Sequence, residues 1–167
     1  MVKPSVELES EWQNIIHEIE AAGEKIVPYS LKLNMLDYPA YLKRTQELSL
    51  GINLDGRVQS DTYFLINQDT NRILGAINLR YTLNAYLFKI GGNIGYGIRP
   101  TERQKGYAKY MLQKGLAICK EHGLTKVLIS CDKLNVASAK TMKSCGAILE
   151  NEVNEEDEII QRYWINL

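Results

Sequence analysis

A strand that leads through a short loop into an amphipathic helix constrains the fold of this chain more than any other feature. Over residues 93–99 apolar side chains alternate with small ones, as in a half-buried strand, and Pro100 ends the pattern. Over residues 106–121 the apolar side chains recur at helical spacing, and Gly123 provides a C-terminal stop. A strand followed by such a helix predicts a domain of the α/β (α+β) class, in which the helix packs on a sheet.

The loop before this helix has the form Arg-x-x-Gly-x-Ala, with Arg103, Gly106 and Ala108 at the defined positions. The first N–H groups of a helix have no intrahelical partner and carry partial positive charge, so a phosphate can bind there. Gly106 lets the backbone approach the anion closely, while Arg103 and Lys105 add charge. The alternative is that Gly106 only starts a helix and that the basic side chains are solvated.

Two other nucleotide-binding motifs are absent from this loop. It contains neither GxxxxGK(S/T) nor GxGxxG, because Gly92, Gly95 and Gly97 have the wrong spacing. These absences argue against a P-loop nucleotidase and against a dinucleotide-binding dehydrogenase.

The charge balance argues against a nucleic-acid partner. Lys and Arg together number 20, and Asp and Glu also number 20, so the formal net charge is zero. A protein that binds nucleic acid through phosphate contacts usually carries a basic excess. No apolar run approaches the roughly 18 residues of a membrane span, and the N-terminus does not resemble a signal peptide. We therefore expect a cytoplasmic protein with no membrane partner.

The cysteines and histidines form no disulfide or metal-binding pattern. Cys119, Cys131 and Cys145 are odd in number and include no CxxC pair, and His17 and His122 lack the spacing of metal ligands. We therefore expect no metal and a reducing compartment.

The remaining patterns are those of a single domain, because 167 residues fit one domain and are short for two. In chain order we expect a helix at 5–22 capped by Ser5, a short strand or extended piece at 25–29, a helix at 38–50, strands at 62–67 and 73–81, a short apolar segment at 86–90, a strand at 126–131, a helix at 136–145 and strands at 147–153 and 158–166. One mixed, mostly antiparallel central sheet with helices on both faces accommodates this order.

Two linked motifs resemble the GNAT superfamily of N-acetyltransferases. The first motif of the family is a strand with a valine-like residue and a nearby proline, followed by Arg/Gln-x-x-Gly-x-Gly/Ala at the start of a helix. The residues that match here are Ile98, Pro100, Arg103, Gly106 and Ala108. The second motif is a helix that opens with Asn and ends at Gly about eleven residues later, as Asn135 and Gly146 do. The resemblance extends from about Thr62 to the C-terminus and is weak before that point.

The resemblance implies acetyl-CoA as a co-substrate. It implies that residues 61–167 are the acetyl-CoA-binding core, and that residues 1–60 are an N-terminal helical part on the acceptor side. In the family the strand that ends near Ile98 pairs with the pantetheine arm, so Gly97 and Arg99 flank this position. Asn135 would lie beside the pantetheine, with Ser138 one turn later on the same helix face. The pyrophosphate would bind the loop and the helix start, formed by Arg103, Gln104, Lys105, Gly106, Tyr107 and Ala108.

The family mechanism implies direct acetyl transfer to a neutral amine in a ternary complex. Free alkyl amines have a pKa near ~10.4, so a base or a water chain must first remove a proton. The backbone N–H of Ile98 is the candidate donor to the oxyanion.

The candidate proton donor departs from the family pattern. Many members carry a tyrosine seven residues after the helix-opening Asn, whereas this chain has Met142, which cannot donate a proton. Ser138 is the candidate that replaces the tyrosine, the alternative being an ordinary serine at a helix start. Cys145 is a weaker candidate, more in keeping with a small buried hydrophobic residue.

The general base is left open. Some relatives place a glutamate on the strand before the loop, but this chain has no carboxylate there. Glu102 is expected to face solvent. Tyr96 or Tyr81 could line the acceptor groove, although core packing is the favoured role for each.

We therefore expect an acetyl-CoA-dependent N-acetyltransferase that acts on a primary amine, which could belong to a small molecule, a peptide or a protein. The alternative is a non-catalytic acyl-CoA-binding module of the same fold, which Met142 motivates. The oligomeric state is left open, a homodimer included.

Overall fold

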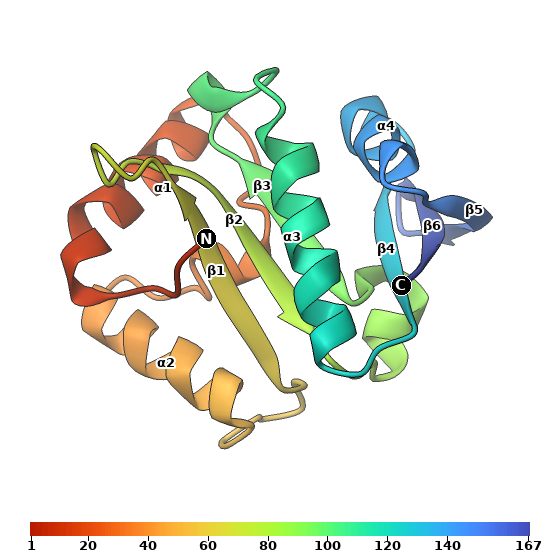
Figure 1. The fold of residues 1–167 in the computed structure, drawn as a ribbon, viewed down its shortest axis with the longest axis horizontal. Helices are drawn as coiled ribbons and strands as arrows, with labels where there is room; N and C mark the ends of the chain where they lie inside the picture. Colours follow the sequence, from red (N-terminus) through yellow and green to blue (C-terminus); the bar gives the residue numbers. More distant parts are fainter.

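Six strands form two antiparallel sheets of three strands each in the computed structural model, which describes residues 1–167 (Figure 1). Neighbouring strands pair in the order β1-β2-β3 in the first sheet and β4-β6-β5 in the second. The strands are β1 (Ser60–Ile66), β2 (Ile73–Arg80), β3 (Ile94–Ile98), β4 (Lys126–Asp132), β5 (Ile148–Glu155) and β6 (Glu158–Asn166).

Helices cover both faces of the first sheet. The α-helices are α1 (Glu9–Ala21), α2 (Tyr38–Leu50), α3 (Tyr107–Glu121) and α4 (Val136–Ser144). The short helical turns are η1 (Val6–Leu8), η2 (Tyr29–Leu31), η3 (Leu87–Gly91) and η4 (Pro100–Glu102). No helix has the length and apolarity that crossing a bilayer requires.

Successive side chains of β2 point to opposite faces of the first sheet, so this sheet contributes to two hydrophobic cores. Ala76 belongs to the core formed with α1 and α2, whereas Ile77 belongs to the core formed with α3. Gly115 of α3 allows close packing on this strand, because an added Cβ would lie 2.7 Å from Ile77 Cδ1. The helix α3 therefore lies directly on the sheet, with its N-terminal end held beside the end of β3 (Figure 1).

The strands β3 and β4 are joined only near one end. The Asn93 N–H donates to the Leu128 carbonyl at 2.6 Å, and the Leu128 N–H donates to Asn93 Oδ1 at 2.8 Å. No ladder continues between the two strands beyond this joint. The side chain of Asn93 thus replaces a backbone acceptor, and the strands part beyond it.

The expected fold class is confirmed, with corrections to its details. The strands form two antiparallel sheets instead of one mixed sheet, because the two ladders meet only at the joint between β3 and β4. The first long helix begins at Glu9, after η1, and the Ser5 side chain makes no capping bond. Residues 25–29 form no strand, because Val27 and Pro28 lie against the face of β3 and not along its edge. The expectation for 38–50 is confirmed at both ends by α2, which Asp37 caps.

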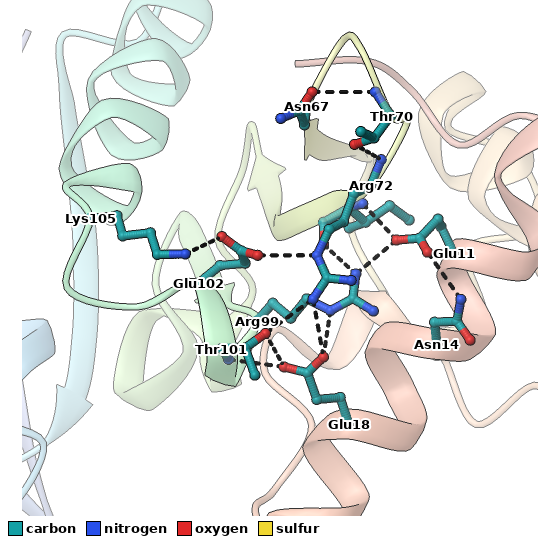
Figure 2. A network of polar contacts seen from close by, with 11 residues as sticks. Glu11, Asn14, Glu18, Asn67, Thr70, Arg72, Arg99, Thr101, Glu102 and Lys105 are labelled. Carbon is teal, nitrogen blue, oxygen red and sulfur yellow. Dashed lines mark hydrogen bonds and ion pairs between the residues drawn. The ribbon is translucent and has the colours of Figure 1, made fainter.

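Arg99 joins α1 to the segment between β3 and α3, as Figure 2 shows. Its side chain is only 2% exposed, and it donates to Glu11 Oε2 and to Glu18 Oε2, both at 2.7 Å. The N–H and hydroxyl of Thr101 donate to Glu18 Oε1 at 2.9 and 2.7 Å. Two carboxylates on one face of α1 therefore fix the backbone that leads into the loop before α3.

We predict that this network makes the free energy of unfolding depend on pH in the acidic range. Burial opposes ionisation of Glu18, but hydrogen bonds from Thr101 and Arg99 lower its pKa from 4.5 to about 2. The unfolded chain thus binds the proton more readily, so the stabilisation is present above about pH 4.5 and is lost as the pH falls toward 2.

The matching variant is Glu18→Gln. It should lower the free energy of unfolding at pH 7 by about 1–3 kcal/mol, as urea unfolding would measure. It should also make this free energy depend less on pH between pH 5 and 2. The control Glu20→Gln removes an exposed partner of Lys32 and should change stability by less than about 1 kcal/mol. Equal effects of the two variants would contradict the role of Glu18.

Candidate active site

The start of α3 presents a row of backbone N–H groups without acceptors. None of the amides from Gln104 to Lys109 donates to another protein group, and the first to do so is Tyr110, which bonds the Gly106 carbonyl at 3.1 Å. Gln104 and Gly106 have φ angles of 61° and 83°, in the left-handed region that forms concave amide nests. An added Cβ at Gly106 would meet no atom within 4 Å, so the space beside these amides is open. This arrangement fits a phosphate group.

The two basic side chains of the loop are already paired with carboxylates. Arg103 donates to the two carboxylate oxygens of Glu24 at 2.8 and 2.6 Å, and its Nε donates to the Ile98 carbonyl at 3.2 Å. Lys105 donates to Glu102 at 2.9 Å. Recognition of an anion here therefore depends first on the backbone amides, because the charges of Arg103 and Lys105 are already balanced by carboxylates.

A cavity of about 490 Å³ connects this loop with β3 and α4, a size typical of small-ligand sites. It brings together most of the predicted cofactor-binding residues, which are Gly97, Ile98, Arg103, Gln104, Gly106, Tyr107, Ala108, Asn135 and Ser138. Lys105 does not line it, although its amide is open. Arg99 does not line it either, because its side chain is buried against α1 and its N–H donates to the Leu74 carbonyl.

The edge of β3 that faces this cavity has unpaired backbone groups. The register pairs Gly97 with Ala76 and Gly95 with Asn78. At the two ends of this ladder, the Arg80 N–H donates to the Asn93 carbonyl and the Arg99 N–H donates to the Leu74 carbonyl. Odd-numbered residues therefore bond β2, and the N–H of Ile98 points to the side of β4, where it has no acceptor. This edge can accept an extended ligand as an added half-strand.

Gly97 is required by close packing on the opposite face of β3. An added Cβ there would lie 2.0 Å from the Val27 carbonyl oxygen. The segment at Val27 crosses the strand at this point and forms one wall of the cavity. The N-terminal part of the chain therefore contributes to the same cavity as the loop before α3.

A pair of hydroxyl groups lies on the inner wall of the cavity. Tyr96 Oη and Ser138 Oγ are 3.1 Å apart, and Asn135 Oδ1 accepts from the Ser138 N–H at 3.0 Å as the cap of α4. Burial raises the pKa of Tyr96 to about 12, so both hydroxyls are protonated at neutral pH. The pair can donate hydrogen bonds to a group in the cavity.

Sequence reasoning gave Tyr96 only a wall or core role and missed this pair. The alternation of β3 did place Tyr96 on the face of Ile94, but its partner on α4 becomes a neighbour only in the folded chain. Met142 is fully buried and offers no proton. Tyr81 lies elsewhere, stacked on His122 with ring centroids 3.9 Å apart and bonded to Asp61.

The carboxylates of the cavity are poor bases. The hydrogen bond from Arg103 lowers the pKa of Glu24, although burial partly opposes it. Hydrogen bonds from Lys105 and Arg72 lower the pKa of Glu102 in the same way, contrary to the expectation that it faces solvent freely. The cysteines are free, and no group of three or more His, Cys, Asp or Glu side chains could hold a metal ion.

Comparison with known proteins gives a family match. A family model described as an acetyltransferase (GNAT) domain matches residues 20–148. A search of curated protein sequences finds no significant match.

Three solved structures illustrate the likeness in fold. The ribosomal-protein acetyltransferase RimL in complex with coenzyme A has a TM-score of 0.72 at 14% identity, with 99% of this chain and 92% of that chain covered. A ribosomal-protein-alanine acetyltransferase from Vibrio fischeri has a TM-score of 0.73 at 13% identity, with coverage of 98% and 90%. The spermidine N-acetyltransferase SpeG from Vibrio cholerae has a TM-score of 0.59 at 15% identity, with coverage of 79% and 76%. At such low identity these likenesses concern the fold alone.

Proposed function

This chain belongs to the GNAT family of acetyltransferases, and from that premise we propose that it transfers the acetyl group of acetyl-CoA directly to a primary amine in a ternary complex. The observation that carries the proposal is the row of acceptor-free amides from Gln104 to Lys109, which opens into the same cavity as the Tyr96–Ser138 pair. One end of the cavity suits a diphosphate, and the other end suits a leaving group that gains negative charge.

The residues fit each part of the cofactor. The amides of residues 104–108 would hold the pyrophosphate, and the open edge of β3 would bond the pantetheine arm near Ile98. Asn135 and Ser138 would flank the arm from α4. When bound, acetyl-CoA supplies an activated thioester. The free N–H of Ile98 can then stabilise the charge that develops on the acyl oxygen.

The difference in pKa between Tyr96 and a thiol decides how the hydroxyl pair acts on the leaving sulfur. A thiol has a pKa of about 8.5, whereas the pKa of Tyr96 is about 12, so full proton transfer from this pair is uphill by roughly 5 kcal/mol. Ser138 therefore stabilises the departing thiolate through a hydrogen bond, and Tyr96 orients the Ser138 hydroxyl. The proton itself is taken from water.

The acceptor is an amine of a small molecule, a peptide or a protein. The relatives named above act on ribosomal proteins and on spermidine, and each kind of amine suits the same transfer chemistry. The division into a core at 61–167 and an acceptor side at 1–60, the cytoplasmic location and a homodimer stay predictions.

Gly106→Ala tests the anion site. The methyl group would project into the open space beside the amides, so we expect coenzyme A to bind at least about tenfold more weakly, which isothermal titration would measure. Gly123→Ala is the matched control, because Gly123 has φ 84°, also meets nothing within 4 Å and lies at the other end of α3.

The two glycine variants carry the same backbone strain. Each should lose about 1–2 kcal/mol of stability from the left-handed φ, but only Gly106→Ala should lose affinity. A folded Gly106→Ala protein that binds coenzyme A as well as the control would overturn the anion site.

Ser138→Ala and Tyr96→Phe test the hydroxyl pair. Each variant should lower the transfer rate by about tenfold to a hundredfold, and coenzyme A affinity should change far less. The double variant should be little worse than Ser138→Ala, since the two groups act as a unit. The control Ser144→Ala removes a hydroxyl of α4 that bonds only the Thr141 carbonyl. Unchanged rates in Ser138→Ala would remove this residue from the reaction.

A second candidate function follows from the burial of Met142 at the position where many relatives carry a tyrosine. On this reading the chain binds acyl-CoA without turnover. Coenzyme A that stabilises the fold, combined with no thiol release from acetyl-CoA by any amine of a broad panel, would favour the binding module over the enzyme.

A further inference from the structure

A second cavity of about 490 Å³ lies on the face of the first sheet that α1 and α2 cover. It is formed by the end of β2, the turn η3, the segment at Tyr29 and Ser30 and the loop at Gly56–Val58. Arg57 and Arg80 are its only charged lining residues, and no carboxylate lines it. The cavity is therefore positively charged, although the whole chain is neutral.

These two arginines differ from all others in the chain. Every other arginine forms an ion pair with a carboxylate, which holds for Arg44, Arg72, Arg99, Arg103 and Arg162. Arg80 donates from Nη1 to the carbonyls of Gly91 and Gly92 at 2.9 and 3.1 Å, and its Nε and Nη2 have no acceptor. Arg57 stacks over Tyr29 at 5.0 Å from the ring centroid and donates to its hydroxyl at 3.3 Å.

Arg80 is half-buried, so the lack of an anionic partner at its guanidinium carries a cost. Loss of solvent lowers the pKa of its guanidinium to about 10, with Arg57 adding to the effect, so the group is still charged at neutral pH. A carboxylate or phosphate matches the planar donors of a guanidinium and would relieve this cost.

An unpartnered hydroxyl also lines the cavity. Ser30 is 4% exposed, and its Oγ has no hydrogen-bond partner in the protein. Its backbone carbonyl is used separately, by the hydroxyl of Tyr41 at 3.1 Å. Buried polar groups normally have a partner, so the free Oγ points to a polar ligand or to water in the cavity.

The second cavity lies across β3 from the proposed thioester site. Tyr96 points toward Ser138 on one face of the strand, whereas the adjacent Gly95 faces the other. Arg80 Nη2 would be 3.1 Å from a Cβ added at Gly95. The same guanidinium bonds Gly91 and Gly92 at the joint where β3 and β4 part. Arg80 therefore lies against the face of β3 at Gly95, beside the joint from which the open edge of β3 starts.

We propose, on the basis of the proposed function, that this second cavity binds the acceptor, and that the acceptor is a small primary amine carrying an anionic group, a carboxylate or a phosphate. Arg80 and Arg57 bind the anion, and Ser30 donates or accepts a further hydrogen bond. The amine then approaches the acyl carbon from the side opposite the cofactor. Its nitrogen forms the new bond to the acyl carbon, the carbon–sulfur bond breaks with its electron pair on sulfur, and the amine proton passes to water.

The same charges aid deprotonation of the amine. Nearby guanidinium groups disfavour an ammonium ion, so they lower the pKa of a bound amine. This effect helps the amine lose its proton without a strong base, because Glu24 and Glu102 of the first cavity are held in ion pairs and are poor bases.

A matched set of amines tests the inference. The probes are 4-aminobutanoate, 3-aminopropylphosphonate, 4-aminobutanamide and 1,4-diaminobutane, with thiol release from acetyl-CoA as the readout. We expect kcat/KM for at least one of the two anionic amines to exceed that of the amide and the diamine by tenfold or more. The ratio of the carboxylate to the phosphonate identifies which anion the site takes. An amide or diamine that equals the better anionic amine would overturn the inference.

Arg57→Gln should abolish this preference mainly by raising KM for the anionic amines. The control Lys43→Gln removes an exposed, unpaired positive charge from the neighbouring helix α2 and should keep the preference. A preference that persists in Arg57→Gln would contradict the assigned site.

A binding measurement separates this inference from the proposed function. The N-acetyl derivatives of the two anionic amines and of the amide are titrated into the protein saturated with coenzyme A. At least one anionic derivative should bind tenfold or more tightly than the amide derivative, and Arg57→Gln should abolish the difference. Absence of turnover with every amine would defeat the proposed reaction, whereas equal binding of anionic and neutral derivatives would defeat the anionic acceptor.

Discussion

The parting of β3 from β4 is the constraint on which the rest of the site depends. The two strands share a joint at Asn93 and Leu128, and beyond it β3 has no partner strand on this edge, where the Ile98 N–H has no acceptor and the Ile98 carbonyl accepts only from Arg103 Nε. A backbone group that is buried without a partner costs about 1–3 kcal/mol, so such an edge persists only where a cavity or a ligand serves it. The start of α3 adds further open amides at the mouth of the same cavity. The fold thus leaves two sets of open backbone groups at one cavity, at the edge of β3 and at the start of α3, which together suit an extended, anionic ligand.

The N-terminal helix holds this open arrangement in place. Arg99 follows β3 directly, and its buried guanidinium is fixed by Glu11 and Glu18 of α1 (Figure 2). Glu102 is in turn bonded by Arg72 and Lys105, so the turn before the anion-binding loop is anchored on both sides. Because a buried charge that loses its partner is costly, the network resists movement of the loop. The geometry of the site therefore rests in part on Arg99, Glu11 and Glu18, which do not themselves line the cavity.

Local patterns predicted the local parts of this structure. The glycine of the loop before α3 predicted the open amides at the start of this helix, because helix ends and their unpaired amides are properties of a short segment. Contacts between distant segments could not be read in this way. Arg99 was expected beside the cofactor, yet two carboxylates far earlier in the chain draw it into the interior. The Tyr96–Ser138 pair and the unpaired Arg57 and Arg80 likewise exist only once the strands and loops are packed.

The cavity proposed for the cofactor is lined by open backbone amides, and the cavity proposed for the acceptor is lined by two arginines without a carboxylate partner. The most direct measurement is a titration of 15N-labelled protein with coenzyme A, followed through its amide NMR signals. We predict that the signals of residues 104–109 shift strongly, whereas the signal of Gly123, at the far end of α3, stays in place. Binding of coenzyme A that leaves the signals of residues 104–109 unmoved would contradict the central claim that these amides hold its pyrophosphate.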